Sequence, residues 1–507
     1  MNCFLKSFRQ LLLITAAVLM AVQLWANNTK PAPAKTQTYS SQFENVLGTS
    51  FEMKLQTSSA KKAALAEKIA LKEIERLSKI LSAYDAESEF SQWMRTQNTP
   101  VKTAPELIEV LGLFDTWKNN TNGAINPAFE TISQLWKNAA TAQVTPSAAA
   151  LQAAVTTANQ QHWTIDYKNG TVTHLTNAPL VLNTFVKSYI INKATEKVMA
   201  ATGIQYVVMN IGGDILVRGN NAETISITNP QANAINDAAL DIIKVQNQFV
   251  ATSGNYRRGY LINNQWYSHI INPATGMPAT GVLSATVIAS NATDAGALAT
   301  AFNVLSVEAC MQLASQFKDI AYLIITNSGA QIQSSNWVSA ATPQPPVVVT
   351  ATNSPNQWDP AFELTINLEL AKFEGPYRRP FVAIWVEDKD KAPVRNLAVW
   401  FNKPRWLHDL RAWYRANYAK YNPEAGTLSN ISSATRSAGK YAIKWDGKDD
   451  NGQLVKTGNY TVHIEVVREH GTYQLISQEV KINNKSSKIE LAPNAEVASA
   501  SFEVKKK

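Results

Sequence analysis

Cysteine is almost absent from this 507-residue sequence, which contains only Cys3 and Cys310. Cys3 precedes an apolar run near the start of the chain, and removal of that segment would leave a single thiol. A single cysteine cannot form an internal disulfide, so a disulfide-stapled scaffold is excluded. Cys310 falls within a helical pattern and is expected to be a buried structural thiol.

Several signatures of catalysis are also missing. The sequence has no Gly-x-Ser-x-Gly elbow, no P-loop and no His-Glu-x-x-His motif. The net charge of +8 is spread along the chain without a basic stripe of interleaved aromatics, so nucleic acid is not an expected partner. Five of the six histidines are scattered without the spacing of a metal site: His162, His174, His408, His463 and His470.

One long apolar run occurs, from Leu11 to Trp25, and it follows the basic residues Lys6 and Arg9. This order is typical of a secretory signal over residues 1–26, and the run is short for a membrane span. We therefore expect a protein of the periplasm or cell envelope that keeps no stable membrane span once the signal is removed. An uncleaved anchor is the alternative.

The remaining chain predicts two folded regions. A long amphipathic helix is expected from Ala60 to Leu81, with Leu65, Ile69 and Ile74 on its buried side. After a proline-rich stretch the pattern changes to period-two alternation with glycine and asparagine turns, which predicts an Ig-like β-sandwich. The expected organisation is a signal peptide at 1–26, a tether at 27–40, a first domain at 41–337, a linker at 338–360, a β-sandwich at 361–490 and a tail at 491–507.

The most informative motifs lie between residues 208 and 306. An apolar β-run is interrupted by Gly212-Gly213, where the backbone can bend and approach a ligand, and Asp214 follows at that bend. Farther along, Asn291-Ala-Thr-Asp294 supplies helix-capping oxygens, and a helix of small residues follows. The first turn of such a helix presents N–H groups that suit a phosphate-bearing ligand.

Together with Ala251-Thr-Ser-Gly-Asn-Tyr256 and His269-Ile-Ile-Asn-Pro-Ala-Thr-Gly-Met-Pro278, these motifs resemble the FAD:protein FMN transferase (ApbE-like) family over residues 40–335. The resemblance implies an α+β transferase domain that moves FMN from FAD to a Ser or Thr of a target protein, assisted by Mg²⁺. The implied partner is a periplasmic or membrane flavinylation-target protein. The second region looks like an uncharacterised domain often fused to this transferase.

The resemblance also implies site residues. The catalytic residue is His269, near the reacting phosphate, and the metal ligands are the backbone carbonyl of Thr184 and the positions of Gly296 and Thr300. Asp294 is either a helix N-cap or a shifted magnesium ligand. The residues expected to contact the cofactor are Leu47, Ala124, Ile125, Asn126, Val181, Lys187, Gly213, Asp214, Gly254, Tyr256 and Ile270.

The sequence departs from the family pattern in one direction. Family carboxylates are replaced at Asn126, Val181, Asn192, Asn272 and Gly296, and one motif glycine is Ser188. Because Mg²⁺ favours carboxylate ligands, these changes predict a weakened metal site. Three functions stay open: a transferase that tolerates the changes, a non-catalytic flavin-binding or interaction scaffold on the same fold, and an adhesin-like surface protein carried by the β-domain.

Overall fold

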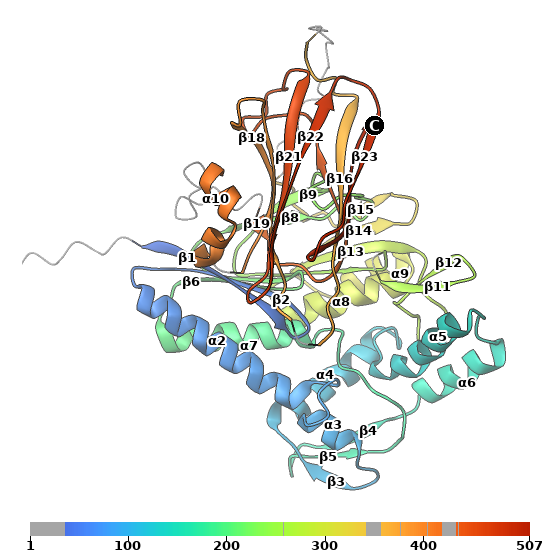
Figure 1. Ribbon diagram of the computed structural model, residues 1–507. Coiled ribbons are helices and arrows are strands. Elements are labelled where there is room, and N and C mark those ends of the chain that lie inside the picture. Colours follow the sequence, from blue (N-terminus) through green and yellow to red (C-terminus); the bar gives the residue numbers. More distant parts are fainter. Residues whose placement is uncertain are drawn as a thin grey trace, which may run out of the picture.

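The computed structural model describes residues 36–256, 258–340, 356–375, 377–402, 404–417, 432–433 and 435–507. The predicted signal peptide, most of the tether and the middle of the linker lie outside these residues. The described chain forms an α+β domain followed by an all-β domain, as predicted (Figure 1). Within the described ranges, every helix is too short or too polar to span a membrane.

The first domain is built on an eight-stranded sheet in which every neighbouring pair is antiparallel. Its first strand begins at Gln37, so the end of the predicted tether belongs to the sheet. In spatial order the strands are β1 (Gln37–Val46), β2 (Thr49–Thr57), β6 (Tyr206–Ile211), β7 (Asp214–Gly219), β10 (Phe249–Gly254), β13 (Val282–Ala289), β14 (Ala321–Thr326) and β15 (Gln331–Gln333).

Three helices cover one face of this sheet: α2 (Ala60–Leu81), α7 (Val186–Thr202) and α8 (Ala292–Val304) (Figure 1). The bounds of α2 match the predicted helix, but Leu65 is 48% exposed and the prediction for its side chain was wrong. Small residues such as Ala66 and Ala70 form much of the buried stripe, because α2 packs directly against α7.

The helices and the smaller sheets complete the first domain. Below the main sheet lie α3 (Glu89–Met94), α4 (Pro105–Asn120), η1 (Pro127–Phe129), α5 (Glu130–Ala142), α6 (Ala148–Ala158) and a sheet of β3 (Pro100–Lys102), β5 (Thr171–His174) and β4 (Trp163–Asp166) (Figure 1). The remaining elements are α9 (Val307–Ala314), the hairpin of β8 (Glu223–Ile227) with β9 (Asp241–Val245), and the hairpin of β11 (Gly259–Ile262) with β12 (Gln265–Ser268). Residues of β8 and β9 pack with the sheet residues that face away from the helices.

The second domain is a sandwich of two sheets, which confirms the predicted all-β class. One sheet has the order β20 (Gly439–Trp445), β16 (Phe362–Leu370), β24 (Val497–Lys506) and β23 (Ser487–Leu491). The other has the order β19 (Ser432–Ser433), β18 (Pro393–Trp400), β17 (Phe381–Glu387), β21 (Gly458–Val467) and β22 (Tyr473–Ile482). Residues 491–507 are therefore wrongly predicted as a tail, because β24 pairs with both β16 and β23.

A short helical segment, η2 (Pro404–Asp409) with α10 (Arg411–Asn417), packs on the second sheet of the sandwich. The carboxylate of Glu465, on β21, accepts the backbone N–H groups of Ala412 (2.9 Å) and Trp413 (2.8 Å) at the start of α10. These amides have no partner within the helix, so the buried carboxylate fixes the helix to the sheet.

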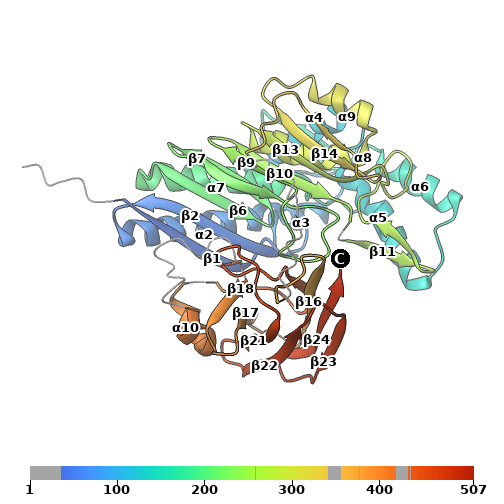
Figure 2. The same ribbon diagram turned by 90° about the horizontal axis from the view of Figure 1, so that it is seen from above.

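The two domains touch at β1 (Figure 2) and at the loop between β8 and β9. The N–H of Gln42 donates to the carbonyl of Asn402 at 3.0 Å, and Glu44 accepts from Thr435. In the loop, the N–H of Ile235 donates to Ala442 at 2.9 Å. The second domain thus holds the strand that leads directly into the turn at residues 45–48.

Candidate functional site

A cavity of about 800 Å³ lies in the first domain, between the turns of the main sheet and the helices α2, α7 and α8. This size is within the range of pockets that bind nucleotide-sized ligands. Ten of the predicted site residues line it: Leu47, Ala124, Asn126, Thr184, Lys187, Asp214, His269, Ile270, Gly296 and Thr300. Segments that are far apart in the sequence therefore meet here.

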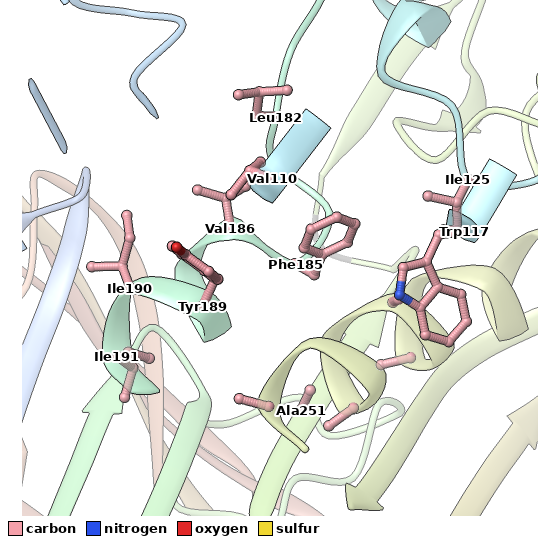
Figure 3. Packing of buried hydrophobic residues seen from close by; sticks show 14 of the residues in the cluster. Val110, Trp117, Ile125, Leu182, Phe185, Val186, Tyr189, Ile190, Ile191 and Ala251 are labelled. Atoms are coloured by element: carbon pink, nitrogen blue, oxygen red, sulfur yellow. The ribbon is translucent and has the colours of Figure 1, made fainter. Parts of the chain in front are cut away.

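Six predicted site residues do not line the cavity: Ile125, Val181, Gly213, Gly254, Tyr256 and Asp294. Ile125 is 1% exposed and belongs to the hydrophobic core, where it lies beside Trp117 (Figure 3). Val181 is also buried, and its N–H donates to the carbonyl of Pro127 at 2.9 Å. Both side chains are therefore packed in the protein interior, next to residues that line the cavity.

The glycine motifs have structural roles. Gly212 and Gly213 have φ of +63° and +100°, so this turn between β6 and β7 needs residues without a side chain. Only Gly212 lines the cavity, and its neighbour donates a hydrogen bond to the side chain of Asn210. A Cβ on Gly254 would lie 2.6 Å from the ring of Tyr256, so this glycine makes room for the aromatic ring.

His269 follows β12 and is fixed by the backbone carbonyl of Arg258, the residue before β11. Its Nδ1 lies 3.0 Å from the carbonyl oxygen of Arg258, which can only accept a hydrogen bond. The neutral ring therefore carries its proton on Nδ1 and keeps a lone pair on Nε2. Burial, aided by the charge of Arg258, lowers the pKa of His269 below 6.5, so the neutral base is the main form at pH 7.

Asp214 is the single acidic residue among the described residues that line the cavity. The hydroxyl of Ser188 lies 3.4 Å from its carboxylate, a long hydrogen bond. Burial raises the pKa of Asp214 to about 6, although the charge of Lys187 and the Ser188 hydroxyl oppose this shift. The protein therefore stabilises this carboxylate only weakly, through one long hydrogen bond and the charge of Lys187.

The positions implied for magnesium do not fit that ion. Gly296 has no side chain, and a Cβ there would lie 2.6 Å from the Ser188 hydroxyl and 3.2 Å from Phe185. The hydroxyl of Thr300 donates to the carbonyl of Gly296 at 3.2 Å. Across the described residues, no group of three or more His, Cys, Asp and Glu side chains is placed to hold a metal. A carboxylate–threonine pair for Mg²⁺ is thus missing here.

Asp294 does not replace the missing carboxylate. The N-cap of α8 is Asn291, whose side chain accepts from the N–H groups of Thr293 (2.7 Å) and Asp294 (3.1 Å), so Asp294 is not the cap. Asp294 is the third residue of the helix, and burial raises its pKa. Since it lies outside the cavity wall, the shifted-ligand alternative has no geometric support.

Asn126 shows why one carboxylate is replaced by an amide. Its Nδ2 donates to the carbonyl of Ala158 at 2.8 Å, and its Oδ1 accepts from the N–H of Ala128 at 2.9 Å. An ionised aspartate could make the second bond but not the first. The amide therefore joins the cavity wall to the end of α6.

Several residues of the cavity wall were missed from the sequence, among them Arg258 and Tyr84. Arg258 lies between the Ser-Gly-x-Tyr turn and His269, and its position between two recognised motifs was the available signal. Tyr84, 78% exposed, accepts a hydrogen bond from Asn183, which also lines the cavity. Tyr84 is exposed because it lies in the turn that follows α2. The sequence around it gives no sign that this aromatic ring is exposed and not part of the core.

Comparison with known protein families finds one matching family model for each of the two domains. The model of the ApbE family matches residues 47–324, and a model described as a predicted periplasmic protein (DUF2271) matches residues 363–499. Two similar curated proteins are named FAD:protein FMN transferase. The one from Haemophilus influenzae is 28% identical over 277 residues, covering 50% of this chain and 77% of that protein. The one from Escherichia coli K12 is 25% identical over 347 residues, covering 66% of this chain and 96% of that protein.

Solved structures agree with the sequence comparisons. The crystal structure of the ApbE protein from Thermotoga maritima is 25% identical with a TM-score of 0.53, covering 59% of this chain and 97% of that one. The apo flavinyl transferase ApbE of Pseudomonas stutzeri, at 21% identity and a TM-score of 0.50, shares the fold. Because its family model spans more than half of the sequence and its cavity unites the predicted motifs, this chain belongs to the ApbE family.

Proposed function

We propose that this chain is an FAD:protein FMN transferase of the periplasm or cell envelope, which attaches FMN to a Ser or Thr of a target protein. In this reaction the acceptor hydroxyl oxygen attacks the FMN phosphorus of FAD. The bond to the AMP phosphate breaks, AMP leaves with the electron pair, and the hydroxyl proton passes to a base. The observation that carries the proposal is the single cavity that brings together ten of the motif residues.

His269 is the base in this proposal. Its neutral ring has a free lone pair on Nε2, and its pKa lies below the usual value, so no deprotonation step is needed before the reaction at neutral pH. Ile270 and Leu47 supply apolar surface in the same cavity. The positions that the family resemblance implies for Mg²⁺ supply no carboxylate at Gly296, so no step of the reaction is assigned to that ion.

One assay tests the proposal. Purified protein is incubated with FAD, with and without Mg²⁺, and with a periplasmic protein known to carry covalent FMN. A fluorescent flavin band that migrates with the acceptor on a denaturing gel is the expected result. Riboflavin in place of FAD is the control, because it has no phosphate to transfer. Absence of the band under all these conditions would overturn the transferase proposal.

The lack of a carboxylate at Gly296 beside Thr300 favours a second candidate, a flavin-binding scaffold without transferase activity. The same samples separate the two functions. Flavin that copurifies or binds under native conditions, without a covalent band on any acceptor, supports the scaffold. A covalent band supports the transferase.

A further inference from the structure

Fixed positive charge exceeds fixed negative charge on the cavity wall. Of the described residues that line it, Lys187 and Arg258 are the Lys and Arg side chains, and Asp214 is the single acid. Lys187 is in the first turn of α7 and acts on Asp214, while Arg258 acts on His269. The two cations therefore belong to different parts of the wall, one beside the turn between β6 and β7 and one beside the start of β11.

The space that a metal ligand would need is filled by the protein itself. The Ser188 hydroxyl and Phe185 occupy the volume next to Gly296, and the Thr300 hydroxyl, which donates to the carbonyl of Gly296, offers only a neutral oxygen. A dication bound here would have to rely on neutral oxygens and on Asp214, whose charge is already opposed by burial. The wall is thus poor in ligands for a cation and rich in partners for an anion.

We propose that the cavity binds the phosphate groups of its flavin nucleotide through Lys187 and Arg258, without a divalent cation. Because it presupposes a flavin nucleotide in this cavity, this binding mode rests on the proposed function. A guanidinium matches the geometry of phosphate oxygens with two parallel hydrogen bonds, and an ammonium neutralises phosphate as a point charge. Two such cations supply the positive charge that a dication would otherwise bring to a pyrophosphate.

The test measures FAD affinity by titration calorimetry with the full chain, in EDTA and in Mg²⁺, at equal ionic strength because salt screens these charges. We expect dissociation constants that agree within about twofold between the two buffers. Lys187→Gln and Arg258→Gln should each weaken FAD binding about tenfold, the change for a lost charge-assisted hydrogen bond of about 1.5 kcal/mol. Riboflavin, which has no phosphate, should bind both variants as it binds the natural protein.

Lys193→Gln is the matched control, because Lys193 lies on the same helix but pairs with Glu109, outside the cavity. Circular dichroism of each variant checks that the fold is retained. FAD that binds in Mg²⁺ but not in EDTA overturns the metal-free mode and leaves the proposed function standing. Variants that keep natural FAD affinity overturn it as well. FAD binding in neither buffer removes the proposed function together with this binding mode.

Discussion

Asp214 in the first domain and Glu465 in the second are both carboxylates whose pKa is raised by burial. Their surroundings differ. Glu465 accepts two backbone N–H groups at the start of α10. Asp214 has a long hydrogen bond to Ser188 and borders a cavity of about 800 Å³.

The difference shows how the two domains use buried polar groups. In the sandwich, one group of buried side chains is joined within itself: Asn396 donates to Asn417 at 2.8 Å, and the Trp413 indole donates to Asn396 at 2.6 Å. Such groups fix a fold and have little capacity left for a ligand. At the cavity, by contrast, Asp214 has only a long hydrogen bond and His269 uses only Nδ1, so both can still bind a ligand.

Replacing His269 should have the largest effect. His269→Ala removes the base, and general-base catalysis contributes about 10²- to 10⁴-fold, so transfer should slow by roughly a thousandfold. Because the pKa of His269 is lowered, the natural rate should fall only as the pH drops below 6.5. Initial rates of covalent labelling measure both effects. His470→Ala, at an exposed histidine, is the control, and equal rates for the two variants would contradict the assignment.

The next largest effect is expected in the sandwich. Glu465→Ala leaves the amides of Ala412 and Trp413 without their acceptor, and the free energy of unfolding of the second domain should fall by about 3 kcal/mol. Urea denaturation followed by tryptophan fluorescence measures the change. Glu479→Ala, at an exposed residue of β22, should change it by less than about 0.5 kcal/mol. Similar values for both variants would mean that the cap contributes little.

Adding a carboxylate to α8 should lower the free energy of unfolding by less than the loss of Glu465 does. Gly296→Asp forces a side chain against Ser188 and Phe185, and such crowding costs about 1 to 3 kcal/mol of unfolding free energy. Ser188→Gly in the same chain should recover part of this loss, and only the double variant should gain thermal stability from Mg²⁺. A Gly296→Asp single variant as stable as the natural protein would show that the space is not occupied.

Removing the charge of Asp214 should change the stability by no more than that crowding does, and only above about pH 4. Its folded pKa, about 6, is above its ordinary value of 3.8, so the folded state holds the extra proton between these values. Stability therefore falls as the pH rises from 3.8 to 6 and is constant above. Asp214→Asn should be more stable than the natural protein at pH 8 by at most about 3 kcal/mol, the equivalent of a pKa raised from 3.8 to about 6, with the gain vanishing near pH 4. Melting temperatures across this range measure it, and a gain that grows at low pH would contradict the shift.

The sequence predicted the elements that depend on local patterns. The bounds of α2, the glycine turn before Asp214 and the two-domain architecture all follow from periodicity and turn residues. It failed where packing between distant segments decides. Ile125 and Gly254 look like ligand contacts within their motifs, but one fills the core beside Trp117 and the other accommodates a ring.

The metal site shows a second limit. The sequence shows directly that position 296 has no carboxylate. It does not show that the space for a side chain there is occupied by Ser188, which lies more than a hundred residues earlier. Contact between these two positions follows from the packing of α7 on α8, which no local pattern encodes. Arg258 lies between two recognised motifs, but only the folded structure shows that it lines the same cavity as Lys187.

Strand β1 joins the sandwich to the cavity. It contacts the second domain through Gln42 and Glu44 and then turns at Leu47 and Gly48, which line the cavity. The free energy of holding that turn in place is therefore shared between the domains, and by reciprocity a ligand that orders the turn must also tighten the domain contact. Slower amide exchange at Gln42 in the presence of FAD would be its signature.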